Sequence, residues 1–141
     1  MNITKIKVRE YFYNTELVEK YCALFIEFNL KKWIKFIIDD GVIQMNTIKD
    51  IDKEGTFRDT EYYYPLVDYP IPDNWGNIIS LNEYRYKDIN GESAGFIFIL
   101  ENKIMSYIQV KDKLEFIEGI KNEIMNNYII IPIEKWKEKL A

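Results

Sequence analysis

The sequence has 141 residues, with no histidine and a single cysteine, Cys22. Without histidine the chain lacks the usual general base, the usual proton shuttle and the commonest zinc ligand. A lone cysteine cannot form an internal disulfide. No Gly-x-Ser-x-Gly, Gly-x-Gly-x-x-Gly or P-loop pattern occurs either. These absences argue against nucleophilic and nucleotide-dependent catalysis, so we expect a non-enzymatic protein that needs no cofactor.

Long apolar runs are also missing. No stretch reaches the roughly 18 apolar residues that a membrane-spanning helix needs. Residues 1–9 alternate apolar and basic side chains and contain no apolar block typical of a secretory signal. Hydrophobic residues nevertheless make up 48% of the chain, which is enough to form a folded core. We therefore expect a single cytoplasmic domain over residues 1–141 that binds no membrane.

Charge is unevenly distributed along the chain. The net charge is -4, but residues 39–83 hold ten acidic side chains against three basic ones, a net charge of -7 for this segment. Phosphate binding needs clustered lysine and arginine, which this segment lacks. The distribution argues against a nucleic-acid partner and favours a basic protein partner, because complementary charge speeds encounter and fixes orientation.

The N-terminal half of the sequence predicts a strand followed by a long helix. Residues 6–13 show the period-2 alternation of a half-buried strand. Asn14 and Thr15 can cap a helix, and from residue 17 onward apolar residues recur at intervals of three and four. Gly41 is a natural stop for this helix, and residues 42–48 follow as a short strand.

The C-terminal half predicts an antiparallel meander and two more helices. Residues 78–110 contain three apolar segments separated by turns at 88–91 and 101–103. Leu114, Ile117, Ile120 and Ile124 have helical spacing, and Pro132 suits the start of a final short helix. The fold class expected is therefore a single α+β domain. Its antiparallel sheet, made of the meander 78–110 and N-terminal strands, would be covered by a long N-terminal helix and by C-terminal helices.

Residues 49–77 show no lasting period and are rich in acidic and aromatic side chains, which predicts a long loop with a binding role. A strand over residues 61–66 is the alternative, and it would shorten this loop. Three successive tyrosines cannot all point into one core if the chain is extended, because neighbouring side chains face opposite ways. Tyrosine and tryptophan are enriched at the energetic centres of interfaces. The candidate partner-binding residues are Asp59, Glu61, Tyr62, Tyr63, Tyr64, Asp68, Tyr69, Asp73 and Trp75.

A metal loop is the alternative interpretation of this acidic segment. Counted from Asp50 as position one, Asp52, Glu54, Gly55 and Glu61 fall at positions three, five, six and twelve of a calcium-binding EF-hand loop. Against this, prolines stand where the exiting helix should run. We therefore expect no metal and interpret the segment as a solvated acidic loop.

The sheet-and-helix pattern resembles bacterial immunity proteins, which neutralise contact-dependent and other polymorphic toxins. The resemblance lies mainly in the strand pair over 95–109 with its turn 101–103, the helix predicted around 116–125, and the closing residues Ile131, Pro132, Ile133 and Trp136. It implies a protein that blocks a basic site on a toxin, such as a nuclease, with an acidic-aromatic surface. Two alternatives remain open: a carboxylate-based enzyme or small-ligand-binding domain that uses Glu61 or Asp68, and a phage inhibitor of host defence.

Overall fold

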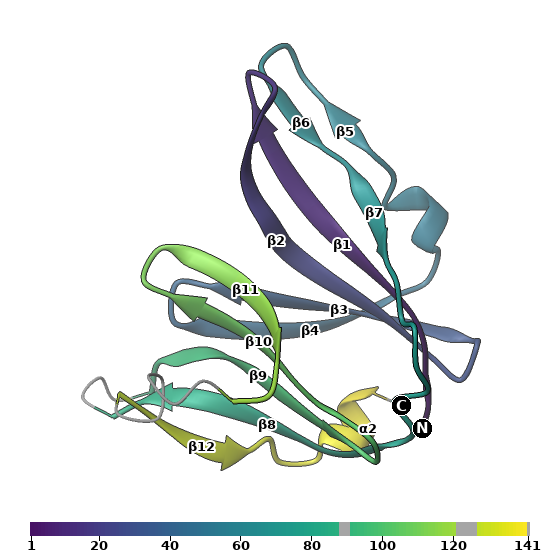
Figure 1. Ribbon diagram of the computed structural model, residues 1–141, viewed down its shortest axis with the longest axis vertical. Coiled ribbons are helices and arrows are strands. Elements are labelled where there is room, and N and C mark those ends of the chain that lie inside the picture. The colour runs from purple at the N-terminus through teal and green to yellow at the C-terminus, as the bar shows by residue number, and fades with distance from the viewer. Residues whose placement is uncertain (88–90, 121–126, 141) are drawn as a thin grey trace.

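The computed structural model describes residues 1–87, 91–120 and 127–140, and this part of the chain is almost entirely β (Figure 1). Within it the helices are a 3-10 turn, η1 (Ile51–Lys53), and one short α-helix, α2 (Trp136–Leu140). The named strands form two antiparallel sheets. The prediction of an α+β domain with a long N-terminal helix and covering C-terminal helices is therefore wrong.

The first sheet has the order β4-β3-β2-β1-β6-β5, and β7 also pairs with β1. Its strands are β1 (Ile3–Tyr13), β2 (Glu16–Phe28), β3 (Lys32–Asp39), β4 (Val42–Ile48), β5 (Phe57–Arg58), β6 (Tyr62–Tyr64) and β7 (Leu66–Tyr69). The second sheet has the order β11-β10-β9-β8-β12. Its strands are β8 (Ile78–Tyr86), β9 (Ser93–Leu100), β10 (Ile104–Val110), β11 (Lys113–Glu118) and β12 (Tyr128–Pro132).

Several predicted strands are confirmed. The strand expected over residues 6–13 lies within β1, the one expected over 42–48 is β4, and the meander over 78–110 is formed by β8, β9 and β10. β9 is central and almost fully buried, as its apolar residues on both faces require. The turn expected at 88–91 lies largely outside the described residues.

The long N-terminal helix is replaced by β2 and β3. Asn14 and Thr15 have φ values of 46° and 70°, so they form a tight hairpin turn rather than a helix cap. Asp40 and Gly41, at 44° and 90°, form a second such turn between β3 and β4. The apolar residues of β2 that fit a helical period pair instead with β1 on one edge and with β3 on the other.

The helix predicted from Leu114 onward is also replaced by a strand. Residues 113–118 form β11, which pairs antiparallel with β10 along its whole length. The remainder of that predicted helix includes residues 121–126, which lie outside the described residues. The short final helix is present as α2, but it begins at Trp136 rather than next to Pro132.

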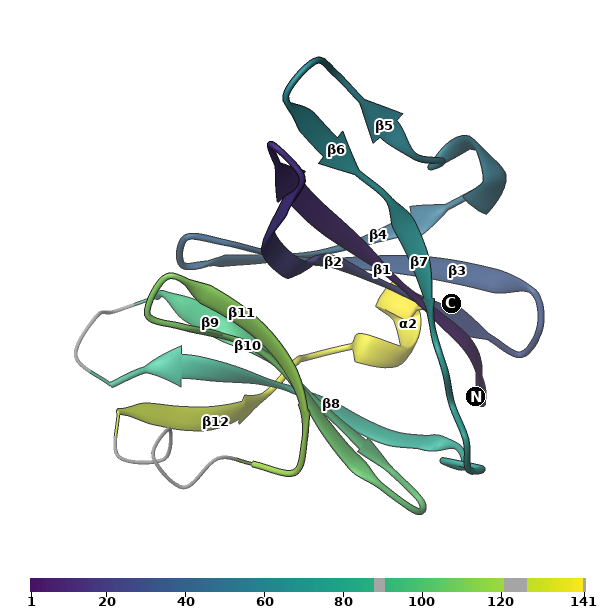
Figure 2. The ribbon, with the colours of Figure 1, turned by 45° about the horizontal axis from the view of Figure 1, so that its top comes forward.

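The main core lies between the two sheets. Phe36 of β3 makes edge contacts with Phe96 and Phe98 of β9, at centroid distances of 5.2 and 5.0 Å. Leu140 of α2 is 1% exposed and packs into the same core, and Figure 2 shows α2 at one side of the gap between the sheets. The Tyr107 hydroxyl of β10 donates to the Tyr21 carbonyl at 2.7 Å, which links the second sheet to β2.

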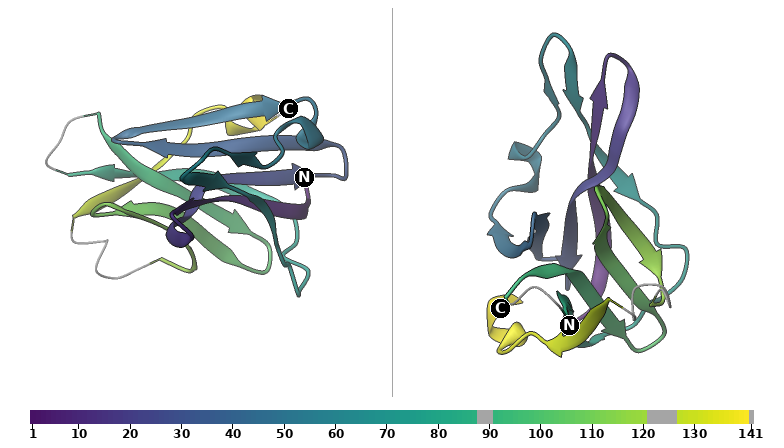
Figure 3. Two further views of the ribbon diagram at one scale, coloured as in Figure 1. Left: turned by 90° about the horizontal axis from the view of Figure 1, so that it is seen from above. Right: turned by 90° about the vertical axis from the view of Figure 1, so that its left-hand side faces the viewer.

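The first sheet extends beyond the second. β2 pairs with β3 only over Leu24–Phe28, so among the described residues the edge of β2 from Glu16 to Ala23 pairs with no further strand, although β11 lies near it and the Leu114 amide donates to the Glu19 carboxylate. Past this point the β1–β2 hairpin and the strands β5 and β6 project away from the rest of the protein (Figures 1 and 3). We call this projection the arm, and define it as residues 10–20 and 57–64.

Gly95 is required by close packing of backbones, and its replacement tests the β9–β10 register. A Cβ atom at Gly95 would lie 2.1 Å from the Tyr107 carbonyl oxygen. We expect Gly95→Ala to lower the free energy of unfolding by about 2 kcal/mol or more, measured by urea denaturation. Gly119→Ala is the matched control, because Gly119 also has positive φ, at 79°, but no atom lies within 4 Å of its added methyl group. Equal costs for the two variants would contradict the register.

Candidate functional site

A row of four tyrosine rings, three of them stacked and the fourth tilted, lies along one face of the arm. Tyr13 and Tyr62 lie 5.4 Å apart between ring centroids, Tyr62 and Tyr11 lie 6.2 Å apart, and Tyr11 and Tyr64 lie 4.9 Å apart. Partial burial raises the pKa of the Tyr11 hydroxyl above its ordinary value, and the neighbouring tyrosines add to the effect. The Tyr11 hydroxyl therefore stays neutral at physiological pH.

Strand pairing explains this arrangement. β1 and β6 are antiparallel, with Tyr13 opposite Tyr62 and Phe12 opposite Tyr63. Because side chains alternate between faces, Tyr62 and Tyr64 share one face with Tyr11 and Tyr13. Tyr63 therefore points to the other face, where it contacts the Phe12 ring. The guanidinium of Arg58 lies 4.2 Å from the centroid of the Tyr63 ring, so this face is braced by a cation–π contact.

Exposed apolar side chains are concentrated on the arm. Among the described residues ten large hydrophobic side chains are exposed, and half of them belong to the arm. These five are Tyr13, Leu17, Val18, Phe57 and Tyr62. The other five are spread over the rest of the protein. Because single exposed hydrophobic residues are ordinary and a cluster is not, the arm is the surface most suited to contact another molecule.

The arm is also acidic. It carries five carboxylates (Glu10, Glu16, Glu19, Asp59 and Glu61) and two cations (Lys20 and Arg58), a net charge of -3. The Asn14 amide donates to the Glu61 carbonyl at 3.0 Å, which holds the two hairpin turns together at the end of the arm. Residues of both turns line a hollow of about 360 Å³ there, and Asp59 and Glu61 are part of its wall.

Arg9 fixes the base of the arm. Its guanidinium is buried and donates to the backbone carbonyls of Gly55, Glu54 and Tyr64, the Glu54 contact being 2.8 Å long. It also lies against the rings of Phe25 and Phe57. Burial lowers the Arg9 pKa, while the Glu54 carboxylate favours its charged form. One cation thus ties β1 to the chain segment before β5 and to the last residue of β6.

The nine predicted site residues fall into two groups. Asp59, Glu61, Tyr62, Tyr63 and Tyr64 lie together on the arm. The segment 49–77 is not one long loop, because it contains η1, β5, β6 and β7.

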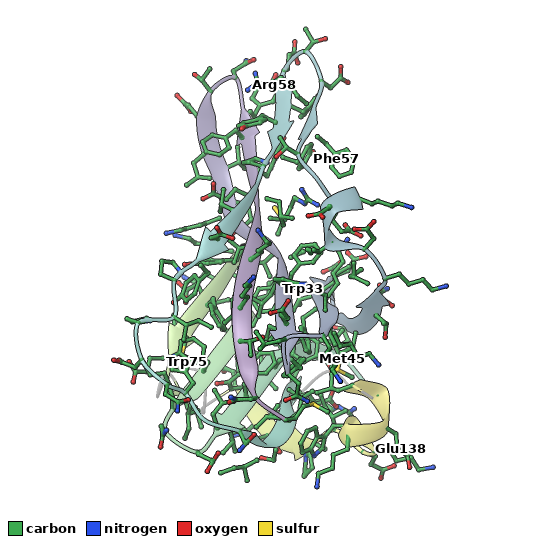
Figure 4. All side chains as sticks on the ribbon, turned by 90° about the vertical axis from the view of Figure 1, so that its right-hand side faces the viewer. Trp33, Met45, Phe57, Arg58, Trp75 and Glu138 are labelled. Atoms are coloured by element: carbon green, nitrogen blue, oxygen red, sulfur yellow. The ribbon has the colours of Figure 1, made fainter. Side chains whose placement is uncertain are left out.

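The other four predicted residues lie away from the arm. Asp68 is exposed and pairs with Lys7 at 2.8 Å, and the hydrogen bond from Lys7 lowers the Asp68 pKa. Tyr69 is half-buried against the Phe116 ring at 5.0 Å. Trp75 is 4% exposed and belongs to the main core, whereas Asp73 is exposed. Figure 4 shows Trp75 far from Arg58 and Phe57 of the arm.

Sequence reasoning missed the half of the arm that β1 and β2 contribute. Tyr11, Tyr13, Leu17 and Val18 belong to the contact surface but lie about 50 positions before the tyrosine triplet. The signal that could have revealed them is the Asn14–Thr15 turn, because a hairpin there exposes the residues on either side of it.

The carboxylates of the proposed EF-hand count do not converge. Asp50 caps η1 by accepting from the Asp52 amide at 3.1 Å, and the Glu54 carboxylate faces Arg9 and Lys35. Glu61 lies at the end of the arm. In the part of the chain that the structure describes, no group of three or more acidic or cysteine side chains is placed to hold a metal ion.

The tyrosine triplet and Asp68 do not share a pocket either. Tyr62 and Tyr63 line the hollow at the end of the arm, whereas Asp68 and Tyr69 line a separate hollow of about 490 Å³ beside Lys5 and Lys7. The geometry therefore does not assemble the tyrosine-walled carboxylate pocket that the enzyme alternative needs around Asp68.

Comparison of the chain with protein-family models, curated proteins and solved structures finds no match. No helix within residues 1–87, 91–120 and 127–140 is long and apolar enough to cross a membrane.

Trp75 and Tyr62 should respond differently to truncation. Trp75→Ala removes a buried core ring and should lower the free energy of unfolding by about 3 to 5 kcal/mol. Tyr62→Ala, at a side chain that is 40% exposed, should cost less than about 1 kcal/mol. Thermal and urea unfolding of both variants check this difference. Similar losses would show that the arm tyrosine is a structural residue.

Replacing Arg9 should loosen the base of the arm. Arg9→Gln leaves the carbonyls of Gly55 and Tyr64 without their donor, so amides of residues 54–58 should exchange hydrogen faster and the free energy of unfolding should fall by about 3 kcal/mol. Lys35→Gln is the control, because it removes the other cation beside Glu54 and leaves those carbonyls bonded. Unchanged exchange in Arg9→Gln would refute this role.

Proposed function

We propose that this protein binds a basic protein through the arm and inhibits it, as immunity proteins do with toxins. The observation that carries the proposal is the coincidence, on one projecting element, of half the exposed large hydrophobic residues with a net charge of -3. Each feature alone is common on protein surfaces, but together they match the anchors and the charge of a protein-binding site.

The two kinds of side chain have separate roles in this proposal. Tyr13, Tyr62 and Phe57 supply ring area that can be desolvated at low cost in side-chain entropy. Asp59 and Glu61 attract a positively charged partner and set its orientation. Stacking and pairing already hold the rings, so little further ordering is needed when the partner binds.

The shape of the arm favours a concave target. A narrow projection can enter a cleft that a flat sheet face cannot, and Figure 3 shows the arm of the first sheet projecting beyond the second sheet. Nuclease active sites are concave and positively charged because they hold phosphates. A nuclease toxin is therefore the partner class that we propose, with the arm occupying the place of the nucleic acid. Phage inhibitors of nuclease-based defence would use the same contacts.

The test uses a basic nuclease domain of a secreted toxin, chosen by reading the genes next to this one. Coexpression of the chain should restore growth of cells that produce such a nuclease. The purified pair should form a complex that Tyr62→Ala weakens by about 2 kcal/mol, or roughly thirtyfold in Kd. The double variant Asp59→Asn, Glu61→Gln should slow association at low salt and reduce its dependence on ionic strength. Calorimetry and stopped-flow fluorescence measure the two effects.

Ile129→Ala is the matched control, because Ile129 is 43% exposed on β12 and lies outside the arm, while Tyr62 is 40% exposed. It should leave affinity unchanged. A complex whose affinity and association rate are the same in wild type, Tyr62→Ala and the double charge variant would exclude the arm as the binding surface.

A further inference from the structure

A second concave surface lies away from the arm, at the side of the sandwich where the two sheets do not meet. Its walls are two apolar side chains of β4 (Ile43 and Met45), two charged side chains of β8 (Glu83 and Arg85), the segment Ile131–Glu134 and Lys139 of α2. The cavity measures about 670 Å³, within the ordinary range of small-molecule sites. Figure 4 shows Met45 beside α2, at the other end of the molecule from Arg58.

This cavity contains a charge pair in which the carboxylate is buried and the guanidinium is partly exposed. Glu83 is 7% exposed, and its carboxylate accepts from the Ser93 hydroxyl at 2.9 Å and from the Arg85 guanidinium. Its neighbours across the sheet are Ile131 on β12 and Phe96 on β9. The Arg85 side chain is 39% exposed, so only the Glu83 carboxylate is desolvated and needs partners. The pair therefore holds a partly exposed cation at the wall of the cavity.

The cations of the cavity have unused hydrogen-bonding capacity. Both oxygens of Glu83 are engaged, whereas the Arg85 side chain is 39% exposed and its Nε, which is buried, has no acceptor among the described residues. The Lys139 side chain is exposed and forms no ion pair with any described residue. Glu134 at the rim is exposed, so water and salt weaken its repulsion of an anion. The free hydrogen-bond donors of the cavity thus belong to Arg85 and Lys139, and the side chains of Ile43 and Met45 on the facing wall are apolar.

We propose that this cavity binds a small organic anion with an apolar body. The acidic head group accepts hydrogen bonds from Arg85 and Lys139, and the body lies against Ile43, Met45 and Ile131. Arg85 is positioned for this by Glu83, which holds one side of the guanidinium and leaves the rest for the ligand. The site uses no residue of the arm, so it stands independently of the proposed inhibitory function.

The test compares two fluorescent probes of similar shape and different charge. 1-Anilinonaphthalene-8-sulfonate is an amphiphilic anion, and N-phenyl-1-naphthylamine is its neutral counterpart. We expect the sulfonate to bind at one site with increased fluorescence and to be displaced by octanoate. Arg85→Gln should weaken the sulfonate about tenfold or more and the neutral probe less than about twofold.

Met45→Trp serves as a second variant that leaves the Glu83–Arg85 pair intact. It fills the cavity from the opposite sheet, so it should weaken both probes, while Tyr62→Ala on the arm should affect neither. The proposal is overturned if the sulfonate does not bind, if Met45→Trp binds it as wild type does, or if Arg85→Gln weakens both probes equally. Circular dichroism and urea unfolding of each variant separate loss of the site from loss of the fold.

Discussion

The projecting part of this protein depends on one buried cation, Arg9. β5 and β6 have only two and three residues, and strands that short are not stable without further support. The Arg9 guanidinium supplies it by binding carbonyls on both sides of them, at Gly55 and Tyr64. Those carbonyls would otherwise lie unpaired beside the Phe25 and Phe57 rings, where an unmet hydrogen bond is costly. Arginine suits this role because it keeps its charge when buried and offers several donors in one plane.

The same element must expose apolar rings without aggregating. An unpaired strand edge next to exposed hydrophobic side chains invites other chains to add to the sheet. On β2 this edge is irregular, with register shifts opposite Tyr11, and the Glu19 carboxylate accepts from the amides of Lys20 and Leu114 at 3.1 and 3.2 Å. Carboxylates around the tyrosine row add like-charge repulsion between copies. The acidic side chains that we propose attract a basic partner therefore also protect this edge.

The sequence predicts the meander well and the first third of the chain badly, for a physical reason. In residues 78–110 turns separate apolar segments of strand length, and only a sheet fits them. In β2 the segment Leu24–Phe28 is buried on both faces, so its near-continuous apolar residues fit a helical period as well as a strand. The decisive signal is the Asp40–Gly41 pair, which favours a two-residue hairpin turn over a helix end.

The tyrosine triplet could be identified from the sequence because side chains alternate between the two faces of a strand, so at least one of the three tyrosines must be exposed. Its partners Tyr11 and Tyr13 could not, because the pairing of β1 with β6 spans about 50 residues.

Both candidate surfaces arise where the two sheets fail to match. At one end β1 and β2 continue with β6 past the last pair of β2 with β3, and the tyrosine rings there pack on one another. At the open side, α2 is the only described helix between the edge strands β4 and β12, and its five residues are too few to fill the space, so a cavity remains. Where the sheets do match, Phe36, Phe96 and Phe98 pack closely and leave no room for a ligand or partner. A β-sandwich with sheets of equal extent would instead bury the apolar residues of the arm and of the cavity in one core. The unequal lengths of the sheets therefore determine where this protein can contact other molecules.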